Sequence, residues 1–287
     1  MARFRRFAAI DWSGAVGPRQ PGIALAICAL GDEAPTLVRP GHIWSRQDVL
    51  DWLLNDLPDE TLVGMDLSPA FPFADAGAYF PDWHDTPANA RDLWALVDTI
   101  CADDPHLAAT SFVDHPDASR HFRRHGGRTG DCFGVGRGRL RVVEDRQRVY
   151  GLSPYSCFNL VGAAQVGKSS LTAMRVLHRL NGRIPVWPFD PCPGTGSVIV
   201  EIYTSLAARQ AGLRAGLSKM RDGAALDTAL AVLDSAPHAP LSRYTDHATD
   251  AVLTAAWLRK VAHNPELWDP EGLDGVAHTE GWTFGVS

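Results

Sequence analysis

The chain lacks a long apolar run, and it lacks a clear export sequence. No stretch approaches the roughly 20 consecutive apolar residues that a membrane-spanning helix needs. The first residues, "MARFRRFAAIDWSG", have a basic start but only a brief apolar run before an acid, so we interpret them as a first strand and not as a signal peptide. These features predict a cytoplasmic protein that does not cross a membrane.

Cysteine motifs are also missing. The five cysteines are too few and too scattered for a disulfide framework, and none of them lies in a C-x-x-C pair. A zinc ribbon is excluded on the same ground. We expect free thiols, buried or half-buried among apolar side chains.

Lysine is scarce, with 3 Lys against 24 Arg, and the net charge of −6 is spread unevenly. Between Ser119 and Arg148 nine arginines stand against three acids, so this window carries +6 and the remainder −12. Such a basic island is typical of a polyanion-binding surface, but also of a solvated Arg-rich loop. The sequence leaves both interpretations open. If the ligand is a nucleic acid, the arginines expected to bind its backbone include Arg123, Arg124, Arg128 and Arg137.

Apolar runs alternate with helical patterns along the 287 residues. Strands are predicted at 6–11, 22–30, 36–44, 61–68 and 196–205, and helices at 46–54, 89–104, 168–180, 203–220, 224–234 and 246–262. This order predicts one α/β domain over 1–287, with a mixed sheet flanked by helices. The Arg/Gly/Pro-rich segment at about 70–195 is predicted to be an elaboration inserted between the fourth and fifth strands.

A phosphate-binding pattern stands at 162–169, where Gly162, Gly167, Lys168 and Ser169 fit G-x-x-x-x-G-K-[ST]. A nucleotide site of this kind needs a buried strand before the motif and a magnesium-binding Asp after a second strand. Here "PYSCFNLV" is a poor strand and "SVIVEIY" carries Glu instead of Asp. A nucleotide-binding enzyme therefore remains the alternative. Backbone N–H groups and Lys168 could also hold a phosphate of another ligand, including a nucleic-acid backbone.

Three buried-looking strands carry an acid within or after an apolar run, namely Asp11, Asp66 and Glu201. Such acids are costly unless they are paired or hold a metal ion. Near the start of the last helix, Asp246 and Asp250 are four residues apart and share one face. Hard oxygen ligands from several carboxylates suit Mg²⁺ or Mn²⁺. The purely structural alternatives are a turn cap for Asp11, an N-cap for Asp246 and an ion pair with an arginine for Glu201.

Seven segments together resemble domain-of-unknown-function family 429, whose members are catalogued as predicted nucleases of ribonuclease H-like fold. The matching segments are "AAIDWSG", "LVGMDLSPAFP", "GAAQVGKSSLTAMRVLHRL", "VWPFD", "VIVEIYTSLA", "DHATDAVLTAAWL" and "EGWTFGV". The resemblance implies a ribonuclease H-like sheet, with Asp11, Asp66 and Asp250 as metal ligands, Glu201 as a family acid and Asp246 as a weaker assignment. It also implies that 162–169 belongs to the family pattern and need not bind a nucleotide.

These observations predict a metal-dependent phosphodiester hydrolase, a nuclease, that uses Mg²⁺ or Mn²⁺. Two such ions can hold the attacking water and the leaving oxygen of a phosphodiester. Asp11, Asp66 and Asp250 would be the ligands, and Glu201 would be a further ligand or orient the water. Ser13 and the backbone of Gly14 are expected to touch a substrate phosphate, and Lys168 and Ser169 to help to hold the nucleic acid. The alternatives are a nucleotide-binding enzyme and a non-catalytic module that binds nucleic acid or protein.

Overall fold

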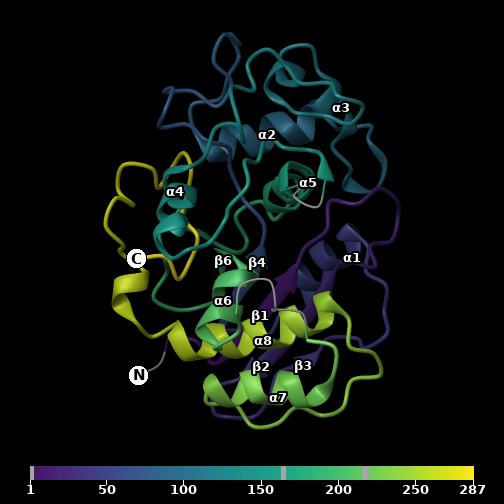
Figure 1. Ribbon diagram of the computed structural model, residues 1–287, viewed down its shortest axis with the longest axis vertical. Coiled ribbons are helices and arrows are strands. Elements are labelled where there is room, and N and C mark those ends of the chain that lie inside the picture. The colour runs from purple at the N-terminus through teal and green to yellow at the C-terminus, as the bar shows by residue number, and fades with distance from the viewer. Residues whose placement is uncertain (1–2, 163–165, 215–219) are drawn as a thin grey trace.

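The computed structural model describes residues 3–162, 166–214 and 220–287, and it has an α/β fold built on one mixed sheet (Figure 1). The strands are β1 (Arg6–Asp11), β2 (Ala24–Ala29), β3 (Thr36–Leu37), β4 (Thr61–Asp66), β5 (Val186–Trp187) and β6 (Val198–Ile202). The sheet order is β3-β2-β1-β4-β6-β5. The strands β1, β4, β6 and β5 are parallel, whereas β2 is antiparallel to both of its neighbours.

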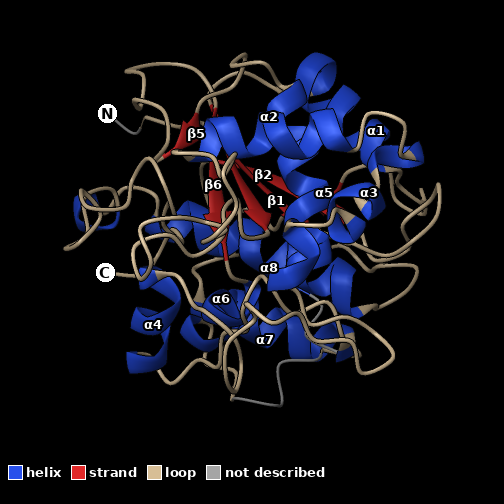
Figure 2. Cartoon of the chain, turned by 90° about the horizontal axis from the view of Figure 1, so that it is seen from above, coloured by secondary structure: helices blue, strands red, loops and turns tan. Residues whose placement is uncertain are grey.

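Helices cover both faces of the sheet, as the view from above shows (Figure 2). None of them, within the described residues, is long and apolar enough to cross a bilayer. Short 3₁₀ turns lie at Pro105–Leu107, Ala118–His121 and Pro265–Leu267, and a π turn at Trp52–Asp56 extends the first helix. The helices are α1 (Arg46–Asp51), α2 (Ala90–Ile100), α3 (Thr110–Asp114), α4 (Val142–Val149), α5 (Val166–Arg179), α6 (Thr204–Gln210), α7 (Gly223–Val232) and α8 (Asp246–Val261).

The two faces of the sheet bury separate apolar cores. Side chains of α2 and α5 pack with Ile10, Met65 and Ile199 on one face. Side chains of α6, α7 and α8 pack with Ala9, Leu62 and Val200 on the other. Because successive side chains of a strand point to opposite faces, neighbours in sequence such as Ala9 and Ile10 belong to different cores. The central strands are thus buried on both sides, which explains their continuous apolar runs.

Helix α8 carries the predicted site residues of the last helix, and its start is fixed by a cap. The Oγ1 atom of Thr245 accepts a hydrogen bond from the backbone N–H of Ala248, 3.2 Å away. Such a cap satisfies one of the N–H groups that lack a partner in the first helical turn. The helix lies along the middle of the sheet, with Leu258 directly over Gly64 of β4. The first turns of α8 therefore reach the ends of β1 and β4.

The observed elements confirm most of the predicted ones and correct five. The predicted strand at 36–44 is wrong beyond two residues, because only Thr36–Leu37 pairs with β2. The predicted helix at 203–220 is α6, which ends at Gln210; residues 215–219 lie outside the described part. The sequence reasoning missed β5, because the prolines near it argued against a strand, and it missed the helices α3 and α4.

The segment at about 70–195 contributes directly to the layered core. Its helices α2 and α5 pack against each other and cover one face of the sheet, and its β5 extends the sheet at the edge next to β6. The loop regions of this segment also hold an aromatic cluster in which Phe71 stacks on Phe158, with ring centroids 4.7 Å apart. The helices that cover one face of the sheet therefore come from residues that follow β4 in the chain.

Gly64 allows α8 to lie close to β4, which makes it a sensitive position. A Cβ atom there would lie 2.8 Å from Leu258 Cδ1 and 2.7 Å from Ile202 Cγ2, well inside van der Waals contact. We predict that Gly64→Val lowers the free energy of unfolding by about 1–3 kcal/mol because it overpacks this interface. The denaturation midpoint in urea measures the change.

The matched control is Gly194→Val, where nothing lies within 4 Å of an added Cβ. We expect that variant to stay within about 0.5 kcal/mol of the wild type. Equal midpoints for the two variants would contradict the close approach of α8 to the sheet.

Candidate functional site

Asp11 and Asp66 lie side by side where two central strands end. Their Cα atoms are direct partners in the parallel register of β1 and β4. Asp11 is buried and Asp66 is half-buried. Asp11 lies two residues after Ala9, and Asp66 two residues after Gly64. Ala9 and Gly64 both face α8. Both carboxylates therefore extend from the α8 side of the sheet, at the carboxyl ends of the strands, where ligands of α/β sheets gather.

The first turns of α8 bring further ionisable groups to this place. His247 Nδ1 lies 2.8 Å from Asp11 Oδ2. The charges of Asp246 and Asp250 act on Asp11 and on Asp66 respectively, so both lie near the strand ends. Asp246 also lies 3.3 Å from the guanidinium of Arg221. The structure thus brings together Asp11, Asp66, Asp250 and Asp246, which the sequence analysis proposed as one group, and adds His247.

The two strand carboxylates are short of positive charge. The pKa of Asp66 is raised to about 8, first by burial and then by the charges of Asp11 and Asp250, against a hydrogen bond from Thr204. Burial also raises the pKa of Asp11, although His247 opposes the rise. The hydrogen bond to Asp11 in turn raises the pKa of His247. Like charges at close range favour a shared proton or a bound cation.

The residues described by the structure do not form a ready-made metal cage. Within the described ranges, no group of three or more His, Cys, Asp or Glu side chains is arranged to hold a metal ion. The donor chemistry nevertheless fits a hard cation, because Asp11, Asp66 and Asp250 offer carboxylate oxygens at one strand edge. Side-chain rotations within the cluster would have to bring the oxygens to a common point.

Glu201 belongs to a different set of contacts. It is paired in register with Met65 and not with Asp66, so its side chain extends from the opposite face of the sheet. There Arg141 binds it with both terminal nitrogens, at 2.8 Å to Oε2 and 2.5 Å to Oε1. Thr283 also donates a hydrogen bond to Oε1. The arginine pair that the sequence analysis kept as an alternative for Glu201 is what the structure has.

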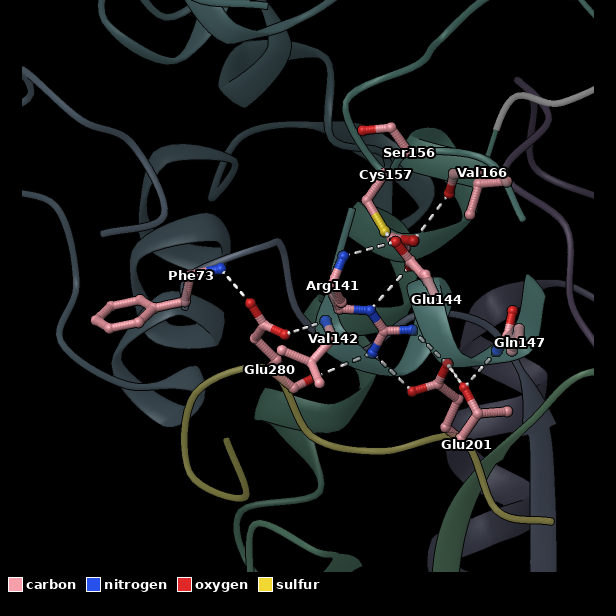
Figure 3. A network of polar contacts seen from close by, with 12 residues as sticks. Phe73, Arg141, Val142, Glu144, Gln147, Ser156, Cys157, Val166, Glu201 and Glu280 are labelled. Atoms are coloured by element: carbon pink, nitrogen blue, oxygen red, sulfur yellow. Dashed lines mark hydrogen bonds and ion pairs between the residues drawn. The ribbon is translucent and has the colours of Figure 1, made fainter. Parts of the chain in front are cut away.

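Arg141 is the centre of a buried polar network (Figure 3). Its Nε donates to Glu144 and its Nη1 also donates to the backbone carbonyl of Glu280. The Glu280 carboxylate accepts from three backbone N–H groups, those of Phe73, Ala74 and Val142. Burial raises the pKa of Glu144. The sequence reasoning missed Arg141, Glu144 and Glu280; the i, i+3 spacing of Arg141 and Glu144 was the one available hint of a local pair.

A cavity of about 180 Å³ connects the two sets of charged groups. Asp66 and Glu201 line it from the strand ends, and Val166 and Ser169 line it from the first turn of α5. The loop before α5 contributes Tyr155. Among the described residues that line this cavity, Asp66 is the one member of the carboxylate cluster, and the Arg141 network bounds the cavity on one side.

The loop after β1 is locked against the start of α5. A Cβ on Gly14 would lie 2.3 Å from the backbone nitrogen of Ser169, so only glycine fits there. Trp12 donates to Ser169 O and to Thr172 Oγ1, both at 3.1 Å, and its side chain is buried in the core. Ser13 Oγ accepts from the N–H of Ala15. Ser13, Gly14, Lys168 and Ser169 are thus neighbours.

The phosphate-binding pattern lacks its usual strand. In the described part of 152–161 the chain makes only an isolated bridge, from Asn159 to Arg123, and α5 already begins at Val166. Residues 163–165 of the pattern lie outside the described ranges. Ser169 Oγ donates to Val166 O, inside the helix. What can be described of the pattern is a helix start that packs on the loop after β1.

Most arginines of the basic window have acidic partners. Arg124 pairs with Asp114 at 2.9 Å, and Arg141 is buried in its network. Ion pairs on the surface contribute little to the stability of the fold, so the arginine can exchange its partner for another anion. Among the residues that the structure describes, no acid pairs with the exposed side chains of Arg123, Arg128 and Arg137. The other pairs are Arg120–Asp131, Arg139–Asp75, Arg146–Glu271 and Arg148–Asp145.

Comparison of the chain with protein-family models, with curated proteins and with solved structures gave no match. The site geometry alone therefore carries the functional argument.

The Arg141 network predicts a large effect on stability. Arg141→Met would leave Glu144 and Glu201 buried without their cation, and breaking a buried pair in this way costs about 3–5 kcal/mol. Chemical denaturation measures it. The control is Arg148→Met, since Arg148 pairs with Asp145 on the surface and we expect a loss below about 1 kcal/mol. A loss of similar size in both variants would refute the network's role.

The raised pKa of Asp66 predicts how stability depends on pH without divalent ions. Between the unfolded value near 4 and the folded value of about 8 the native state holds more protons than the unfolded chain. The free energy of unfolding should therefore fall as pH rises through this range in EDTA. His247 acts in the same direction, because its pKa is also raised.

Asp66→Asn should flatten that decline, because the amide does not titrate. The check is the melting temperature of both proteins from pH 5 to pH 9 in EDTA. The same slope in the wild type and the variant would contradict the assignment of the raised pKa to Asp66.

Proposed function

We propose that this chain is a metal-dependent phosphodiester hydrolase, a nuclease, whose site is the carboxylate cluster at the ends of β1 and β4. The observation that carries the proposal is the direct pairing of Asp11 with Asp66 in the register, with the first turns of α8 beside them. This agrees with the residue positions that a ribonuclease H-like fold would use: the first strand, the fourth strand and the start of the last long helix.

In this proposal Asp11, Asp66 and Asp250 would hold Mg²⁺ or Mn²⁺. Such ions supply an activated water and neutralise the developing charge on a phosphodiester. The chain itself holds the carboxylates on rigid strands, and Thr204 fixes one oxygen of Asp66. His247 orients Asp11 by its 2.8 Å contact. Asp246 lies one helical turn before Asp250 and would contribute negative charge around the site.

Glu201 has a different part in this proposal from the one that the sequence analysis gave it. Its carboxylate is engaged by Arg141 and Thr283, so it shapes the wall of the cavity and is not proposed as a metal ligand. The junction of α5 with the loop that follows Asp11 contains Lys168, Ser169, Ser13 and the backbone of Gly14. We propose that they contact a substrate phosphate.

The exposed arginines of the basic window would bind the rest of a nucleic-acid strand. Arg123, Arg128 and Arg137 have the most accessible charge, whereas Arg124 would have to leave Asp114. Exchange of one surface ion pair for another costs little. Binding through these residues should weaken with salt, since each phosphate contact releases a counterion.

One observation favours a second candidate. Because the described carboxylates are not arranged as a metal cage, a non-catalytic module that binds nucleic acid or protein remains the main rival. That rival predicts binding that is indifferent to EDTA and to Asp11. The nucleotide-binding alternative predicts saturable binding of ATP that Lys168→Ala removes.

The test is Mn²⁺ binding, measured by calorimetry, together with cleavage of labelled single-stranded DNA, duplex DNA, RNA and an RNA–DNA hybrid. We predict that Asp11→Asn abolishes cleavage and weakens Mn²⁺ binding at least tenfold, since loss of groups that merely support metal ligands already costs 10–100-fold. EDTA should abolish cleavage by the wild type.

The matched control is Asp145→Asn, which removes an exposed acid from α4 and should leave both properties unchanged. Equal affinity of the wild type and of Asp11→Asn for Mn²⁺ would refute the proposed metal site. Cleavage that persists in EDTA would sink the metal-dependent mechanism.

A further inference from the structure

The cavity beside Asp66 has an aromatic rim. Tyr155 lines the cavity and is nevertheless 42% exposed, so its ring lies at the opening and not in the core. Tyr203 lines the same cavity as Tyr155 and Asp66. Tyr155 thus shares its cavity with Asp66, one of the proposed metal-binding carboxylates.

Arg137 lies over the ring of Tyr155. Its guanidinium carbon is 5.3 Å from the ring centroid, within the range of a cation–π contact. Arg137 is exposed, and no acid among the described residues pairs with it. An exposed aromatic ring backed by an uncommitted cation offers stacking to a flat, electron-rich group and attraction to a neighbouring anion. A nucleotide combines these two properties in its base and its phosphate.

The size and place of the cavity limit what can bind there. At about 180 Å³ the cavity is smaller than the 300–1,000 Å³ usual for a whole drug-sized ligand. A cavity of this size can take only part of a ligand, such as a single base or a single phosphate group. Bases of a duplex already stack on their neighbours, and extruding one costs a few kcal/mol. An unpaired base can enter the cavity without this unstacking energy.

We propose that Tyr155, supported by Arg137, is a stacking platform for an unpaired base, and that the substrate class is single-stranded nucleic acid. This proposal rests on the proposed nuclease function, because it places the base of the nucleotide next to the phosphate that is held at the Asp66 cluster. Tyr155 positions the strand; the carboxylates act on the phosphate. Stacking on an aromatic side chain tolerates every base, so little sequence preference follows.

The test uses the full chain and labelled oligonucleotides, with Ca²⁺ in place of Mn²⁺ and, separately, with EDTA. Fluorescence anisotropy gives the dissociation constants of a single strand and of the matching duplex. We expect the single strand to bind more tightly. Tyr155→Ala should weaken single-strand binding roughly 5- to 150-fold, the range found for loss of one base–aromatic stack, while Tyr155→Phe keeps it. Mn²⁺ affinity should be unchanged in both variants.

A second readout reports stacking itself. A 2-aminopurine base in the single strand should be quenched on binding to the wild type and to Tyr155→Phe, but not to Tyr155→Ala. The matched control is Tyr150→Ala, because Tyr150 is similarly exposed but bonds to Ser287 and does not line this cavity. It should bind and quench like the wild type.

The outcomes separate this proposal from the nuclease proposal. Stacking by Tyr155 without any cleavage in Mn²⁺ would keep the platform and refute the nuclease. Cleavage with duplex binding as tight as single-strand binding, or with Tyr155→Ala unchanged, would keep the nuclease and overturn the platform. Absence of nucleic-acid binding by the wild type under both conditions would overturn the platform as well.

Discussion

Two carboxylates that end neighbouring parallel strands impose the main physical constraint on this molecule. Asp11 and Asp66 are held opposite each other by the backbone register, so they cannot move apart without breaking the centre of the sheet. Their burial and proximity make the doubly charged state costly, as the raised pKa of Asp66 shows. A cation bound at this place would relieve that cost, which is the physical basis of the proposed metal site.

The second buried group of charges shows how the same fold treats acids that serve structure. Around Arg141, the carboxylates of Glu144, Glu201 and Glu280 are satisfied by guanidinium nitrogens and backbone N–H groups. This network joins α4, β6 and the C-terminal segment, in which Phe284 also donates its N–H to the carbonyl of Glu201. These paired acids contrast with Asp11 and Asp66, whose pKa values are raised by burial and, for Asp66, by the neighbouring carboxylates.

The sequence was enough to predict the sheet's central strands and the acids on them. The continuous apolar runs of β1 and β4 follow from burial on both faces, and each run ends in its Asp. The edge strands β3 and β5 have two residues each, so the strand at β3 was predicted too long and β5, which lies among prolines, was missed. The start of α8 was predicted from its acidic first turn, whereas the contact of His247 with Asp11 depends on how that helix lies over the sheet.

The role of Glu201 could not be read from the sequence, because it depends on register. A shift of one residue between β4 and β6 decides which face of the sheet the side chain joins. The composition of the Arg-rich window likewise did not distinguish a buried Arg141 from an exposed Arg137. Arg141 is buried because it pairs with Glu201, which lies 60 positions later in the chain.

The most direct test of the central claim is anomalous X-ray diffraction from crystals grown with Mn²⁺. The account predicts a manganese peak bounded by the carboxylates of Asp11, Asp66 and Asp250, with Glu201 still bound to Arg141. Manganese bound elsewhere, or no peak at this strand edge at millimolar Mn²⁺, would contradict it.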